Sequence, residues 1–74
     1  MVRCKFGGVV IESAGYDAQK ALLEVEFVRN GQILQYFGVP EDVWYHFKGE
    51  QKPDFFFQRA IKGCYKEKKR IGSA

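Results

Sequence analysis

The dipeptide Asn30-Gly31 constrains the fold of this chain more than any other feature. It lies between residues 22–28 and 32–37, two segments rich in β-branched, aromatic and alternating apolar side chains. Asn-Gly readily adopts the positive φ angles of a two-residue type I′ turn, which joins antiparallel strands. The sequence therefore predicts a tight hairpin in which Val25 faces Tyr36 across the strand pair.

The two faces of this predicted hairpin differ in chemistry, because side chains alternate across a strand. One face is apolar and is expected to form the core: Leu23, Val25, Phe27, Leu34 and Tyr36. The other face carries Glu24 and Glu26 and is expected to be largely solvated. Apolar side chains on that polar face form a candidate interaction surface, namely Val28, Ile33 and Phe37.

The segments on either side of the hairpin predict the remaining elements. Residues 9–16 are typical of a further strand, and residues 2–6 alternate in a way that would add a short N-terminal strand. Downstream, Pro40 precedes two acidic residues and suits the start of a helix that Gly49 ends. Pro53 begins a second helix.

Together these elements predict an α+β fold. The expected architecture is a three-stranded antiparallel meander, with or without the short extra N-terminal strand, followed by two helices packed on one face. At 74 residues the chain is long enough for one domain only. We expect that domain to occupy residues 1–65 and residues 66–74 to form a basic C-terminal tail.

Positive charge is concentrated at the C-terminus. Residues 62–74 hold five basic side chains against one acidic, whereas the whole chain has a net charge of +3. Such a segment attracts polyanions, although a solvated basic helix end has the same composition. If the second helix continued, most of its cations would lie on one side, and the candidate nucleic-acid-binding residues are Arg59, Lys62, Lys66, Lys69 and Arg70.

Residues that could carry catalysis or bind metal do not form a recognisable group. His46 is the single histidine and falls opposite the apolar side of the first predicted helix. Cys4 and Cys64 lie near opposite ends of the chain, without the spacing of a zinc site. No apolar run is long enough to span a bilayer. We therefore expect a cytoplasmic protein that is not an enzyme, with no metal, cofactor, membrane or small-molecule substrate.

Several separated motifs resemble the KTSC domain, over residues 9–65. They are Ile11-x-x-x-x-Tyr16-Asp17, Leu22-x-x-x-x-Phe27, Asn30-Gly31, Tyr36-Phe37-Gly38-Val39-Pro40 and Phe57-x-x-x-Ile61. This module is found at the C-terminus of some lysyl-tRNA synthetases and as stand-alone bacterial proteins, and the resemblance implies an association with RNA. In one departure, Leu34 replaces the first tyrosine of the family's Tyr-x-Tyr.

Two functional hypotheses follow. The first is a small non-enzymatic module that binds RNA through the basic end of its second helix. The alternative is a protein-interaction or self-association module that uses the open sheet face and an edge strand. Such a module would bind a protein partner or form a homodimer.

Overall fold

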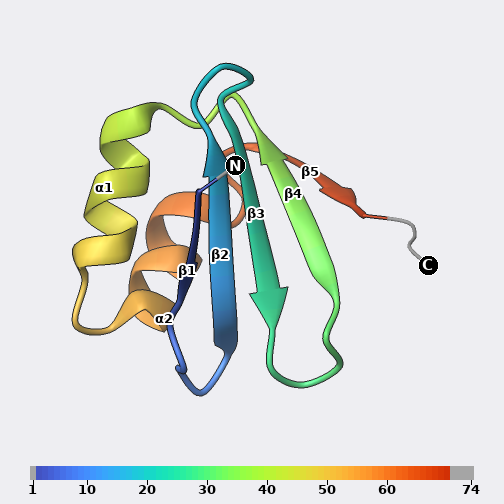
Figure 1. Ribbon diagram of the computed structural model, residues 1–74, viewed down its shortest axis with the longest axis vertical. Coiled ribbons are helices and arrows are strands. Elements are labelled where there is room, and N and C mark those ends of the chain that lie inside the picture. Colours follow the sequence, from blue (N-terminus) through green and yellow to red (C-terminus); the bar gives the residue numbers. More distant parts are fainter. Residues whose placement is uncertain (1, 71–74) are drawn as a thin grey trace.

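Five antiparallel strands form one sheet in the computed structural model, which describes residues 2–70 (Figure 1). The strand order along the sheet is β1-β2-β3-β4-β5, so each strand pairs with its neighbours in sequence order. The strands are β1 (Val2–Lys5), β2 (Ile11–Asp17), β3 (Leu22–Phe27), β4 (Ile33–Phe37) and β5 (Lys66–Lys69). The α+β class is confirmed, but the predicted three-stranded meander undercounts the strands.

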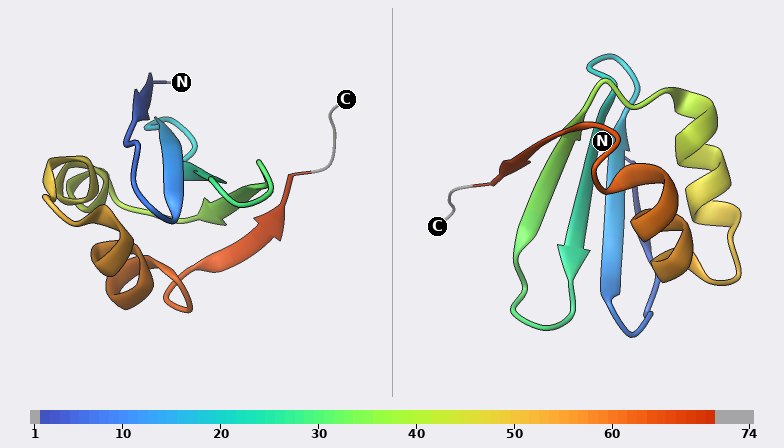
Figure 2. Two further views of the ribbon diagram at one scale, coloured as in Figure 1. Left: turned by 90° about the horizontal axis from the view of Figure 1, so that it is seen from below. Right: turned by 180° about the vertical axis from the view of Figure 1, so that it is seen from behind.

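Two helical segments cover one face of the curved sheet and leave the other face open (Figure 2). Helix α1 (Glu41–Gly49) begins directly after Pro40 and ends at Gly49, as predicted. Helix α2 (Pro53–Phe56) continues as a π-helical segment, η1 (Phe57–Ile61). Gly63 has a φ of +82°, which favours glycine, and the chain turns back there instead of continuing the helix.

The segment predicted as a C-terminal tail contains β5. Residues 66–69 pair with β4, and the Tyr36 hydroxyl donates a hydrogen bond of 2.8 Å to Glu67. Burial and this hydrogen bond raise the pKa of Tyr36, so its hydroxyl stays protonated and able to donate. Four charged residues have little intrinsic preference for a strand. Their strand conformation therefore depends on backbone hydrogen bonds to β4, which the local sequence does not predict.

The hairpin between β3 and β4 forms where Asn30-Gly31 predicts it, but with a longer turn. The Phe27 amide donates to the Gln32 carbonyl at 3.0 Å, which leaves four residues in the turn. The Gln32 amide donates to the Asn30 side chain at 3.0 Å and stabilises this longer connection. Within this turn only Gly31 adopts a positive φ, of +67°, whereas a type I′ turn needs two such residues.

The longer turn shifts the predicted register by two residues. Val25 pairs with Leu34 instead of Tyr36, and Leu23 pairs with Tyr36. A shift by an even number keeps every side chain on its face. Val25 and Tyr36 are therefore fully buried, as predicted.

Aromatic side chains dominate the core between the sheet and the helices. Phe47 of α1 packs against the rings of Phe6, Phe56 and Phe57, with centroids 4.9–6.4 Å apart. Trp44 stacks on Tyr16 of β2 at 5.6 Å. The Tyr16 hydroxyl donates to the Val39 carbonyl at 2.6 Å, and burial raises its pKa. This contact fixes the connection between β4 and α1.

Candidate functional site

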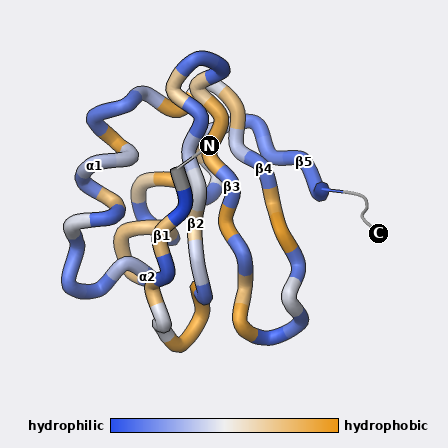
Figure 3. Tube along the Cα trace, viewed as in Figure 1, coloured by the Kyte–Doolittle hydropathy of each residue, from blue (hydrophilic) through white to orange (hydrophobic). Residues whose placement is uncertain are grey.

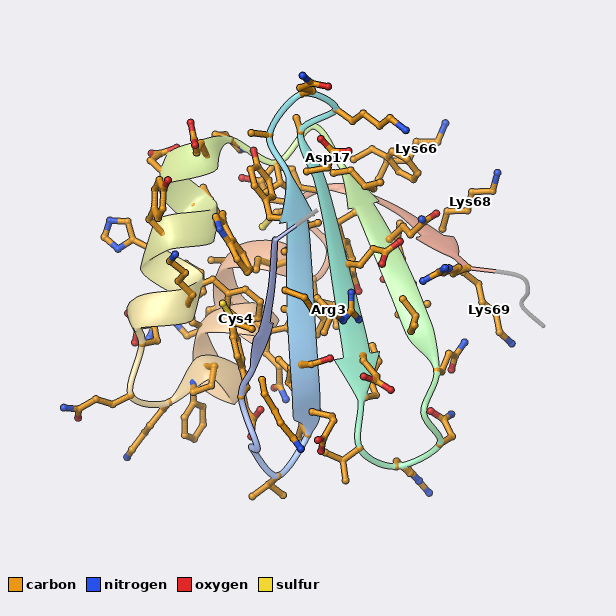
Figure 4. All side chains as sticks on the ribbon, viewed as in Figure 1. Arg3, Cys4, Asp17, Lys66, Lys68 and Lys69 are labelled. Atoms are coloured by element: carbon orange, nitrogen blue, oxygen red, sulfur yellow. The ribbon has the colours of Figure 1, made fainter. Side chains whose placement is uncertain are left out.

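The open face of the sheet carries a row of polar side chains across its middle. Paired residues of neighbouring strands lie on the same face, so the register brings Arg3, Gly15, Glu24, Gln35 and Lys68 into one line. Glycine at the second place leaves no side chain between Arg3 and Glu24. Figure 4 shows Arg3 lying over the centre of this face.

Glu24 is buried at the centre of this face, with only 5% of its surface exposed. Arg3 and Arg70 each place Nη1 against its Oε1, at 3.2 and 3.4 Å. Gln35 donates to its Oε2 at 2.9 Å. The prediction of a solvated Glu24 is therefore wrong, because side chains from β1 and from the residue after β5 cover it.

The second acidic residue of the hairpin is also engaged. Glu26 is half-buried and accepts a hydrogen bond of 2.7 Å from the Ser13 hydroxyl. Both carboxylates that the sequence placed on this face therefore interact with neighbouring side chains. At Glu24 two cations compensate the charge, which reduces the repulsion that it would exert on an approaching phosphate, whereas Glu26 accepts only from a neutral hydroxyl and keeps its net charge.

An aromatic ring and two lysines lie together at the β4–β5 side of the face. Phe37 is 36% exposed and pairs with Lys66, while Lys68 pairs with the neighbouring Gln35. Within residues 2–70, neither lysine forms an ion pair. Figure 4 shows both lysines extending from β5. We call this group, Gln35, Phe37, Lys66, Lys68 and Arg70, the basic rim.

The structure does not bring the five predicted nucleic-acid-binding residues together. Because residues 66–69 form a strand, Lys66 and Arg70 share the open face while Lys69 lies on the opposite face. Arg59 belongs to η1 and Lys62 follows it, so both lie in the helical layer. Arg59 lines a hollow of about 570 Å³ there, with Lys52 and the exposed Phe55.

Two basic residues of the open face are absent from the sequence-based set: Lys68 of the basic rim, and Arg3, which contacts Glu24. Alternation along residues 66–70 would have grouped Lys66, Lys68 and Arg70, but only if a strand had been predicted there. Arg3 could not be found from sequence, because its approach to Glu24 depends on the glycine between them in the sheet.

The candidate interaction surface is also divided. Ile33 and Phe37 lie on the open face, where Ile33 is half-buried beside Arg70. Val28 lies in the β3–β4 turn and is exposed. The edge strand β5 carries three lysines, a composition that disfavours pairing with another strand.

Other chemistry-bearing residues lie apart. Among residues 2–70, no group of three His, Cys, Asp or Glu side chains is arranged to hold a metal ion. Cys4 and Cys64 are free thiols. His46 is exposed and its ring stacks on Phe56, with centroids 6.4 Å apart. Within the same residues, no helix has the length and apolar character needed to cross a membrane.

Known proteins share this architecture. The sequence matches the family model of the KTSC domain over residues 9–65. The structure is similar to the crystal structure of a KTSC domain protein from Yersinia pestis, with a TM-score of 0.88 and 35% sequence identity. That similarity covers 96% of this chain and 97% of the other. Among curated proteins, none matches this chain.

Proposed function

This chain belongs to the KTSC domain family, which is not a known family of enzymes, and from that premise we propose a binding function. The proposed ligand is single-stranded RNA, and the proposed site is the basic rim on the open face of the sheet. The location differs from the helix end that the sequence favoured. The association with lysyl-tRNA synthetases that the resemblance implies motivates the choice of RNA as the ligand.

One observation carries the proposal: an exposed aromatic ring lies beside two lysines that form no ion pair among the described residues, on the face where the Glu24 carboxylate is compensated. A single-stranded nucleic acid requires a cationic path for its phosphates and an aromatic face on which a base can stack. Phe37 offers the aromatic face, and Lys66 and Lys68 offer the cations. The pairing of Glu24 with Arg3 and Arg70 lowers the repulsion that would otherwise oppose phosphate binding.

The lysines are suitably placed for successive phosphates. They are two residues apart on one strand, which separates their Cα atoms by about 6.6 Å. Both lysines are exposed, and their long side chains extend from the sheet edge. Their ammonium groups are therefore accessible to the phosphates of an RNA strand. Arg70 has further N–H groups besides the one facing Glu24 and supplies a third cation.

The salt dependence of RNA binding tests this proposal. We expect a single-stranded RNA of about ten nucleotides to bind at low salt, with a log–log slope near −2 for three phosphate contacts. The double variant Lys66→Gln/Lys68→Gln should reduce the magnitude of that slope by about 1.4. Fluorescence anisotropy of labelled RNA across a salt series measures both values.

A matched variant separates the two faces of the molecule. Arg59→Gln/Lys62→Gln removes the same charge from the helical layer and should leave the slope unchanged. If this variant reduces the magnitude of the slope and Lys66→Gln/Lys68→Gln does not, then RNA binds at the helix end and the proposed site is wrong. Absence of binding at low salt would remove the RNA proposal altogether.

A further inference from the structure

An apolar recess lies at the turn end of the sheet, on the opposite face from the basic rim. It has a volume of about 370 Å³ and lies between the β1–β2 turn and the β3–β4 hairpin. Its apolar lining comes from Val9, Val10, Phe27 and Leu34, and Arg29 stands among its polar lining residues. Phe27 and Leu34 belong to the side of the sheet that the helices cover elsewhere.

The walls of this recess are fixed by the rest of the fold. Phe27 packs edge-on against Phe57 of the core, with centroids 5.5 Å apart. The Val28 amide donates to the Val10 carbonyl at 2.9 Å and joins the two turns. The Asp54 carboxylate accepts hydrogen bonds of 3.2 Å from the amides of Val10 and Ile11. The recess is therefore pre-formed, so binding does not carry the entropy cost of ordering its walls.

Exposed apolar side chains stand at its edge. Val9 is 86% exposed, more than any other large hydrophobic side chain between residues 3 and 70. Val28, in the neighbouring turn, is also exposed. Figure 3 shows hydrophobic segments where both turns meet this end of the sheet. Exposed apolar groups around a partly apolar hollow are typical of a surface that contacts another molecule.

The charges near the recess indicate the kind of partner. Arg29 lines it, and Lys69 lies opposite Leu34 on the same face of the sheet. None of its lining residues is acidic, and the nearby Asp54 carboxylate is engaged by the amides of Val10 and Ile11. We propose that this recess binds a large apolar side chain of an acidic peptide segment in a partner protein. The volume is near the lower end for ligand pockets, which suits a single anchoring side chain.

Short probe peptides test this proposal. Acetyl-Glu-Phe-Glu-amide should bind about ten-fold or more tightly than acetyl-Glu-Ala-Glu-amide, because burying a phenylalanine side chain contributes about 1.5–3 kcal/mol. Acetyl-Lys-Phe-Lys-amide should bind more weakly than the first peptide, since Arg29 and Lys69 repel it. Methyl chemical shifts of Val9, Val10 and Leu34 in NMR titrations locate and quantify binding.

Exposed positions provide variants that keep the fold. Val9→Ser should weaken the Glu-Phe-Glu peptide and leave the Glu-Ala-Glu peptide unchanged, whereas Arg29→Gln/Lys69→Gln should abolish the preference for acidic flanks. No methyl shift up to about 5 mM peptide would overturn the proposal. So would equal binding of the phenylalanine and alanine peptides, or of the acidic and basic peptides.

This inference is independent of RNA binding. Lys66→Gln/Lys68→Gln should leave peptide binding unchanged, because both lysines lie on the other face of β5 from Lys69. Conversely, Val9→Ser should not alter the salt slope for RNA. Each proposal can therefore fail without the other.

Discussion

Replacing Phe47 with alanine is expected to remove about 3–5 kcal/mol from the free energy of unfolding. Phe47 is fully buried, and its ring meets Phe6 of the N-terminal segment as well as Phe56 and Phe57 of the second helical segment. A domain of this length has a total of about 4–11 kcal/mol. The variant should therefore lie close to the limit of folding, as urea denaturation followed by Trp44 fluorescence would show.

Phe55→Ala is the matched control for this substitution. Phe55 belongs to α2, close to the same aromatic cluster, but 61% of its surface is exposed. Its truncation should change the free energy of unfolding by no more than about 0.5 kcal/mol. Equal losses of unfolding free energy for Phe47→Ala and Phe55→Ala would contradict the placement of Phe47 in the core and of Phe55 at the surface.

The second large effect concerns the buried carboxylate of the open face. The double variant Arg3→Met/Arg70→Met should lower the free energy of unfolding by about 1.5–3 kcal/mol, because Glu24 then keeps only the Gln35 amide as a partner. Methionine retains the apolar stem of each arginine. The expected loss is below that of a fully buried pair, since both arginines are partly exposed.

Adding Glu24→Gln to that double variant should restore most of the loss, since no unpaired charge then remains buried. The same urea denaturation measures all of these variants. A double variant as stable as the wild type would show that Arg3 and Arg70 do not compensate Glu24. Failure of Glu24→Gln to restore stability would show that the loss came from packing.

The sequence predicts most of the fold, because it depends on local signals. Alternation places Val25 and Tyr36 in the core even though the turn is longer than expected, since a shift of two residues preserves the faces. Pro40 and Gly49 mark the limits of α1 as predicted. In both cases the local preference of the sequence agrees with the tertiary packing, so the predicted burial and helix limits match the structure.

Strand β5 and the basic rim depend on contacts distant in sequence, and this is why they could not be predicted. Charged residues carry no local preference for a strand, so only the unpaired edge of β4 gives residues 66–69 their conformation. The burial of Glu24 likewise requires Arg3 and Arg70, which are far apart in the chain. The predicted group of five cations assumed a continuous helix, and the strand divides that group between two faces.

The most direct test of the RNA proposal is the aromatic NMR spectrum of the ring-labelled protein during addition of single-stranded RNA at low salt. The Phe37 ring resonances should shift, because a base stacks on that ring, while those of the more exposed Phe55 ring should stay in place. A shift of Phe55 without a shift of Phe37 would contradict binding on the open face of the sheet.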